Sequence, residues 1–353
     1  MCRSKLAGKA QMVLGSVSAK DLGIVLPHEH LLSDLSMRFR MRELATANEK
    51  ALAHQPVSLE NRYWVVFHQE GNLDNLQLLD EKLAINEALN YKQAGGNTIV
   101  DLSNIGSGRD PLGLKHIALA TGLNIIMGSG YYVSATHSAD IDRKTEDEIA
   151  EEIVRDITLG VGDTGERAGI IGEIGCSWPL VDNERKVLRA ASLAQQLTGA
   201  PLNIHPGPHS SAPFEIIEIL RNSGADISRT VISHIDRTIR NPEDCCKLME
   251  SGCYLEYDMF GWEGYFPRDV AMVDLPNDTQ RINELIELIA QGYVNQILIS
   301  QDICCKVRLR CYGGHGYSHI LDNVVPLMRD KGISKEHISS ILVENPKHLL
   351  QFV

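Results

Sequence analysis

The chain has 353 residues, of which 34 are lysine or arginine and 46 are aspartate or glutamate, so its formal charge at pH 7 is −12. This balance argues against binding to nucleic acids or anionic membranes, which requires clustered positive charge. A hydrophobic content of 43% is too high for a disordered chain, and no run approaches the roughly 20 apolar residues of a membrane-spanning helix. The first residues lack a signal-peptide pattern and the eight cysteines lack a Cys-x-x-Cys spacing, so we expect reduced thiols and a cytoplasmic location.

Eight short apolar runs recur along the chain and are separated by stretches of helical periodicity. In chain order, strands are predicted at residues 24–30, 97–102, 124–127, 169–174, 201–205, 230–234, 253–257 and 296–300. Such runs are typical of strands that are buried on both faces of a parallel sheet. Amphipathic helices are predicted between them at residues 76–94, 146–159, 183–197, 214–223, 242–251 and 279–292.

Eight strands alternating with helices in a chain of this length predict a (β/α)₈ TIM barrel, formed as a single domain by residues 1–353. The alternative is an open doubly wound sheet, but no Gly-x-Gly-x-x-Gly follows the first strand. A long insertion occupies about residues 33–75, after the first strand. In a barrel it would lie on the active-site face, where it would serve as a lid or as a dimer contact.

Histidines and carboxylates stand where five of the predicted strands end. The first strand ends in His28-Glu29-His30, and because side chains two residues apart on a strand point the same way, both histidines face the barrel axis and Glu29 faces out. The other residues of this kind are Glu173, His205, His234 and Asp302. Alone, His205 or His234 is better explained as an ordinary buried histidine. Because catalytic residues of barrels gather at the carboxyl ends of the strands, the whole set predicts a metal site.

Six ligands exceed the needs of one tetrahedral zinc ion and indicate two divalent ions. One ion would be held by His28, His30 and Asp302. The other would be held by His205 and His234, and Glu173 would bridge the two. With a bridging hydroxide the site would keep a net charge of about +1, which favours an anionic or strongly polarised substrate oxygen. Metal-bound water of pKa about 7 is a nucleophile at neutral pH. Zinc, manganese, cobalt and iron all accept such ligands.

Several stretches of the chain resemble the phosphotriesterase family of the amidohydrolase superfamily, most closely its animal phosphotriesterase-related subgroup. They include the segments around His28, Glu173, His205 and His234, and Tyr312-Gly-Gly-His315 near the end of the chain. The resemblance implies a barrel with a binuclear centre, usually zinc, often in a homodimer, and the same six ligands. Phosphotriesterases proper have a carboxylated lysine where this chain has Glu173, and their histidine–aspartate proton relay is not recognisable after the seventh strand.

The resemblance also implies a hydrolase in which a metal-bridging hydroxide attacks a small acyl substrate. Asp302 would act as a ligand and take the proton as general base, and Glu173 would act through its bridging position. The subgroup is associated with short N-acyl amides of the taurine type, which favours an amidohydrolase of N-acyl amino acids or N-acyltaurine. A lactonase, a carboxylesterase, a phosphotriesterase (organophosphate hydrolase) and an inactive metal-binding barrel stay open as alternatives.

Five further residues are predicted to contact the substrate. They are Tyr132, Trp178, Arg237, His315 and His319. Arg237 follows the sixth strand, and its planar guanidinium would bind an anionic group. Each residue has a structural alternative, such as core packing for the aromatic side chains or a salt bridge for Arg237. For Arg109, an ion pair that locks the top of the barrel is the better explanation.

Overall fold

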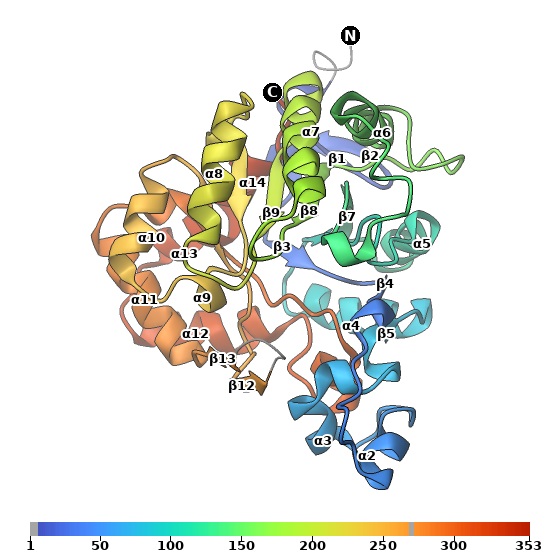
Figure 1. Ribbon diagram of the computed structural model, residues 1–353. Helices are drawn as coiled ribbons and strands as arrows, with labels where there is room; N and C mark the ends of the chain where they lie inside the picture. Colours follow the sequence, from blue (N-terminus) through green and yellow to red (C-terminus); the bar gives the residue numbers. More distant parts are fainter. Residues whose placement is uncertain (1–5, 268–271) are drawn as a thin grey trace.

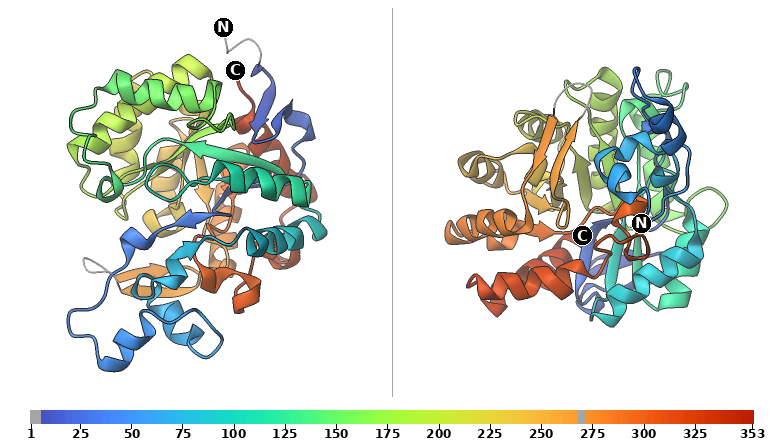
Figure 2. Two further views of the ribbon diagram at one scale, coloured as in Figure 1. Left: turned by 90° about the vertical axis from the view of Figure 1, so that its right-hand side faces the viewer. Right: turned by 90° about the horizontal axis from the view of Figure 1, so that it is seen from below.

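The computed structural model describes residues 6–267 and 272–353, and its centre is a ring of eight parallel strands (Figures 1 and 2). The strands are β3 (Val25–Glu29), β6 (Thr98–Asp101), β7 (Asn124–Ser129), β8 (Ile170–Gly175), β9 (Leu202–His205), β10 (Thr230–Ile232), β11 (Tyr254–Tyr257) and β14 (Ile297–Ile299). Each strand pairs with the next one in this order. All eight predicted strands are present, and the predicted TIM barrel is confirmed.

Ser300 joins the last strand of the barrel to the first. Its Oγ donates a hydrogen bond to the carbonyl oxygen of His28 at 2.7 Å and accepts one from the amide of His28 at 3.2 Å. The amide of Asp302 also donates to the carbonyl oxygen of His28, at 3.3 Å. The polar ends of β14 and β3 are thereby held together, which places their side chains over one opening of the barrel.

Helices surround the strands on the outside of the barrel (Figure 1). The predicted helices correspond to α4 (Glu81–Gln93), α6 (Glu146–Thr158), α7 (Asp182–Thr198), α8 (Ala212–Asn222), α10 (Pro242–Met249) and α11 (Asp278–Ala290). The prediction placed the start of α4 five residues too early, because residues 77–78 form the short strand β5 (Gln77–Leu78) and the carboxylate of Asp80 caps the helix. None of the described helices is both long and apolar enough to cross a membrane.

Helix α5 (Pro111–Thr121) was missed by the sequence analysis, as were the short helices α12 (Val325–Asp330), α13 (Lys335–Ser339) and α14 (Asn345–Leu350). Helix α5 begins with a proline and contains Gly113, which weakens its helical pattern. Proline fits the first turn of a helix, and the side chain of Asp110 caps this one by accepting a hydrogen bond from the amide of Gly113.

The insertion after β3 forms a separate layer at the carboxyl end of the barrel, drawn in blue at the lower right of Figure 1. Its base is the antiparallel pair of β4 (Ser33–Asp34) and β5, and it carries α2 (Ala47–Leu52) and α3 (Arg62–Phe67). Polar contacts attach it to the loop after β14. Lys306 pairs with Asp74 at 2.6 Å, and the side-chain oxygen of Asn75 accepts a hydrogen bond from the amide of Val307 at 3.0 Å.

Candidate metal centre and active site

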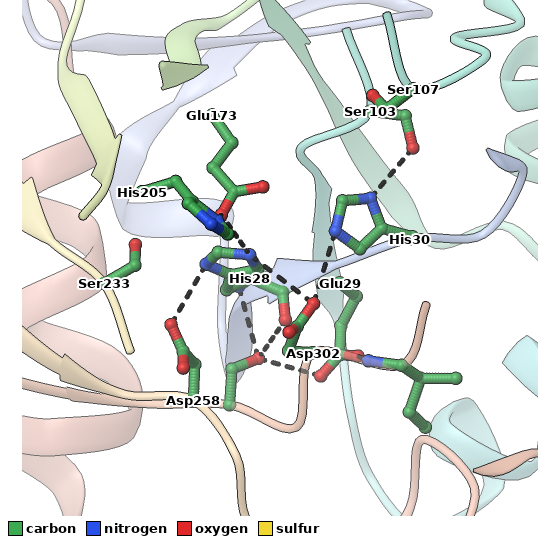
Figure 3. A network of polar contacts seen from close by, with 12 residues as sticks. His28, Glu29, His30, Ser103, Ser107, Glu173, His205, Ser233, Asp258 and Asp302 are labelled. Atoms are coloured by element: carbon green, nitrogen blue, oxygen red, sulfur yellow. Dashed lines mark hydrogen bonds and ion pairs between the residues drawn. The ribbon is translucent and has the colours of Figure 1, made fainter. Parts of the chain in front are cut away.

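The six predicted metal ligands meet at the carboxyl end of the barrel, and Figure 3 labels all of them except His234. Nε2 of His30 lies 3.3 Å from Oδ1 of Asp302, and Nε2 of His28 lies 3.7 Å from the same oxygen. Among these six residues, two groups of three have ligand atoms within 4.8 Å of one another: His28, His30 and Asp302, and His28, Glu173 and His234. His28 therefore stands between two halves of one cluster.

The carboxylate of Glu173 connects the histidines of three strands. Its Oε1 lies 2.5 Å from Nδ1 of His205, 2.7 Å from Nε2 of His234 and 3.7 Å from Nε2 of His28. The side chain is 3% exposed, so this oxygen is almost fully removed from bulk water. Glu173 therefore has the position that a carboxylate would need in order to bridge two metal ions.

Three of the four histidines have one ring nitrogen fixed by a neighbour outside the cluster. Nδ1 of His28 donates to Glu256 at 3.0 Å and Nδ1 of His234 donates to Asp258 at 2.8 Å. Nδ1 of His30 lies 3.0 Å from the hydroxyl of Ser103, whose own hydrogen is donated to the carbonyl of Leu32. Each arrangement leaves the Nε2 lone pair directed into the cluster. Metal-binding histidines are usually oriented in this way.

Nε2 of His28 provides a direct test of whether a metal ion fits. The residue is fully buried, and this nitrogen has no hydrogen-bond partner in the part of the chain that the structure describes. A buried polar atom without a partner costs about 1–3 kcal/mol. Nε2 faces the carboxylates of Glu173 and Asp302, each at 3.7 Å, and in the neutral ring whose Nδ1 donates to Glu256 it would offer its lone pair to a metal ion. The donor set of four imidazoles and two carboxylates therefore fits divalent ions.

The charges of the cluster favour an ionised Glu173 and a neutral His205. Burial alone would raise the pKa of Glu173, but the surrounding imidazoles, His205 first and then His28, attract and hydrogen-bond the carboxylate and hold its pKa well below its usual range. Burial lowers the pKa of His205 to about 3. Burial also opposes the protonation of His234, but Asp258 outweighs it and raises the pKa to about 9. A metal ion would displace that proton, because only neutral imidazole coordinates.

The backbone around Asp302 and His234 adopts a conformation that side chains other than glycine rarely take. Their φ angles are +47° and +54°. Such strain persists where the surroundings enforce it, often at functional sites. Here Glu29, whose side chain faces away from the cluster as predicted, accepts hydrogen bonds from the amides of Gln301 and Ile303, both at 2.9 Å. The buried carboxylate thus fixes the turn that carries Asp302.

A cavity of about 560 Å³ opens directly above the cluster. Its lining includes Glu173, His205, His234 and Asp302 together with Tyr132 and Arg237, two of the predicted substrate contacts. The insertion contributes another part of the wall, with Arg38, Trp64, Phe67 and Glu70 among its residues. The cavity is large enough for a small organic substrate, and its lining contains both charged and aromatic side chains.

The other three predicted substrate contacts do not line this cavity. Trp178 stacks on His209, with ring centroids 4.4 Å apart. His319 pairs with Asp278 at 2.7 Å, and the ring of His315 packs against Gly261, where a Cβ atom would lie 2.7 Å from it. His315 and His319 thus pack against the segment after β11 and Trp178 against the loop after β9, and the contact of all three with a substrate stays a prediction.

Arg109 forms the ion pair that the sequence analysis expected. Its Nη1 lies 2.9 Å from Oδ2 of Asp156 and donates to the carbonyl of Gly128 at the same distance. The arginine side chain is 6% exposed. The pair therefore ties the loop after β6 to α6 and to β7, away from the cavity.

Sequence reasoning missed the carboxylates that orient the ligands. Glu256 and Asp258 alternate with apolar residues at the end of β11, and both are fully buried. Oε2 of Glu256 accepts hydrogen bonds from His28, Asn203 and Ser233 at 2.9–3.0 Å. Charged residues in an otherwise apolar strand were the available signal, because a buried carboxylate requires partners.

Comparisons with known proteins agree with this geometry. The model of the Phosphotriesterase family matches residues 8–350. A protein of Xenopus tropicalis named N-acetyltaurine hydrolase is 46% identical over 351 residues, which cover 99% of each chain. A protein of Bos taurus with the same name is 43% identical over 350 residues, again 99% of each chain. The solved structure of a resiniferatoxin-binding protein from Rhodobacter sphaeroides is 32% identical, has a TM-score of 0.94, and covers 98% of this chain and 95% of its own.

The family expected from the sequence motifs is therefore confirmed. The match extends over nearly the whole chain, and the relatives have essentially the same length. The fold agrees, and the cluster of histidines and carboxylates lies where catalytic residues of barrels gather. The chain belongs to the phosphotriesterase family and is a metal-dependent hydrolase.

Proposed function

We propose that the protein hydrolyses the amide bond of small N-acyl sulfonates and N-acyl amino acids, with N-acetyltaurine as its first candidate substrate. The observation that carries this proposal is the position of Arg237. This guanidinium lines the same cavity as the cluster, and its Nη2 lies 3.2 Å from Nε2 of His205. It offers a positive charge to an acidic group at one end of a substrate whose acyl group meets the cluster. The names of the relatives from Xenopus tropicalis and Bos taurus support the same substrate.

Six side chains would hold two ions per chain. His28, His30 and Asp302 would bind one ion, His205 and His234 the other, and Glu173 both. We propose zinc, although manganese, cobalt and iron accept the same ligands. When bound, such ions polarise a carbonyl oxygen and lower the pKa of water to about 7.

The side chains of this site then have separate tasks. Asp302 accepts the proton of the attacking water as general base, since its side chain is 12% exposed toward the cavity while its Oδ1 faces His30. Tyr132, whose ring meets that of His205 edge-on at 5.1 Å, contacts the acyl oxygen. Arg237 binds the acidic end. Glu256 and Asp258 keep the imidazoles of His28 and His234 in place.

We further propose that the protein acts in the cytoplasm as a homodimer. The seven cysteines in the described part of the chain are all free thiols, which suits a reducing compartment. Three large apolar side chains of the insertion are strongly exposed, namely Leu44 at 92%, Leu59 at 72% and Tyr63 at 79%. Such groups are suited to burial against a second copy of the chain.

The test combines metal analysis with a substrate panel. Protein purified without added chelator would be analysed for metal and then assayed with N-acetyltaurine, a lactone, a carboxylic ester and a phosphotriester. We expect close to two metal equivalents per chain and the highest kcat/KM for the acylamide. Preferred turnover of the lactone, ester or phosphotriester would replace the amidohydrolase proposal. Absence of any turnover by the metal-loaded protein would favour a barrel that only binds.

A further inference from the structure

Arg38, a residue of the insertion, is a second arginine that lines the cavity besides Arg237. Its Nε and Nη2 both donate to Oε1 of Glu70, at 3.1 and 2.7 Å. Its Nη1 lies 3.5 Å from the hydroxyl oxygen of Tyr132. The side chain is 25% exposed, so it reaches solvent or a bound molecule in the cavity. Glu70 thus fixes one edge of the guanidinium and leaves Nη1 on the side of Tyr132.

The two arginines lie on one continuous wall. Arg38 contacts Tyr132, the ring of Tyr132 meets His205, and Nε2 of His205 faces Nη2 of Arg237. All four line the cavity.

Arg237 has no carboxylate partner in the described residues of the chain. Its Nη2 also donates to the carbonyl of Pro206 at 3.2 Å, and its Nη1 is buried without a hydrogen-bond partner. Glu70 compensates the charge of Arg38, but no ion pair compensates Arg237 within the described residues. A partly buried guanidinium with an unused N–H group gains most from an anion that enters the cavity.

We propose that Arg38 and Arg237 form a two-arginine clamp for the oxyanion group of the substrate, a sulfonate or a carboxylate. Arg38 is then a specificity-determining residue that the insertion contributes to the barrel. A sulfonate has three acceptor oxygens and can receive hydrogen bonds from both guanidinium groups, whereas a neutral acylamide gains nothing from either. The proposal rests on the proposed amidohydrolase function, because it assigns the acidic end of that substrate.

The experiment compares Arg38→Gln, Arg237→Gln and the unaltered protein with two substrates. N-acetyltaurine carries the sulfonate, and N-acetylethanolamine replaces it with a neutral hydroxyl. For Arg38→Gln we expect KM for N-acetyltaurine to rise about tenfold, because a charge-assisted hydrogen bond is lost, with kcat and the KM for N-acetylethanolamine unchanged. Arg237→Gln should show a larger rise. Arg189→Gln removes an exposed arginine that pairs with Glu146 on the outside of the barrel, and it serves as the matched control.

A second measurement does not depend on turnover. Binding of ethanesulfonate to the metal-loaded protein would be followed by calorimetry, and we expect both cavity variants to weaken it while Arg189→Gln does not. Equal KM changes for both substrates, or unchanged ethanesulfonate binding in Arg38→Gln, would overturn the clamp. Failure of the unaltered protein to hydrolyse any acylamide would instead overturn the proposed function, and the sulfonate measurement would still test the clamp.

Discussion

The cluster at the barrel end and the insertion that covers it are built in different ways. The ligand side chains project from strands or from the turns that follow them, and buried partners such as Glu29, Glu256 and Asp258 orient them through hydrogen bonds. The insertion consists of two short α-helices, three single helical turns and a two-residue strand pair, and its contacts with the loop after β14 include those of residues 306–307. The strands and the buried hydrogen bonds therefore hold the cluster in place, whereas the position of the insertion depends on its contacts with the barrel.

Because of this difference, we expect the cluster to carry out the reaction and the insertion to determine which substrate binds. A metal centre needs ligand atoms held within a few tenths of an ångström, which strands and buried hydrogen bonds provide. Recognition of a substrate end tolerates more freedom and is suited to loops. Changes in the cluster should therefore alter metal content and kcat, and changes in the insertion should alter KM while leaving the metal in place.

Replacing Glu173 should have the largest effect. Glu173→Ala removes the carboxylate that faces His28, His205 and His234, so at least one ion should be lost. We expect activity to fall by about 1,000-fold or more, because metal catalysis contributes several kcal/mol. Elemental analysis of the purified variant measures the loss directly. Two tightly held ions in this variant would contradict the bridging role.

Asp302→Asn should be the next most damaging change. The amide keeps the size of the side chain but cannot accept a proton, so kcat should fall by about 100- to 10,000-fold with a smaller change in KM. The assay would use every small acyl substrate that the unaltered protein turns over, together with metal analysis. If metal stays bound and kcat does not change, Asp302 is only a ligand and the general base must be sought elsewhere.

Glu256→Gln tests the carboxylate that orients the imidazole of His28. The change removes the charge that receives the Nδ1 proton of His28 but keeps hydrogen-bonding capacity toward Asn203 and Ser233. Partners of metal-binding histidines contribute about 10- to 100-fold in metal affinity, so competition with a chelator should show a loss in this range. Glu146→Gln on the outer face of α6 is the matched control. Equal affinity in the two variants would assign Glu256 to packing alone.

The barrel and its cluster were predictable because both depend on patterns within short stretches of the sequence. Apolar runs located all eight strands, and polar residues at the strand ends identified the six side chains that the structure brings together. The alternation that placed Glu29 on the opposite side from His28 also holds. These inferences needed only the periodicity of a strand and the topology of a barrel.

The cavity wall was less predictable because it depends on contacts between distant segments. Arg38 reaches Tyr132, 94 positions away, only because the insertion folds back over the barrel. The loop that carries His315 and His319 looked suited to substrate recognition, yet His319 turns to Asp278. No local pattern reports which way such a loop folds, whereas the alternation of Glu256 and Asp258 with apolar residues was a signal that could have been used.

The smallest expected effect lies in the attachment of the insertion. Asn75 is fully buried, and its side-chain oxygen receives the amide of Val307 while its Nδ2 donates to the carbonyl of Gln69 at 3.1 Å. Asn75→Ala leaves both backbone groups without this partner, at a local cost of about 1–3 kcal/mol. We expect faster amide hydrogen exchange across residues 45–76 and a rise in KM of a few fold, with metal content unchanged. If the variant instead loses metal, the insertion also stabilises the cluster, and the separation between the two regions would not hold.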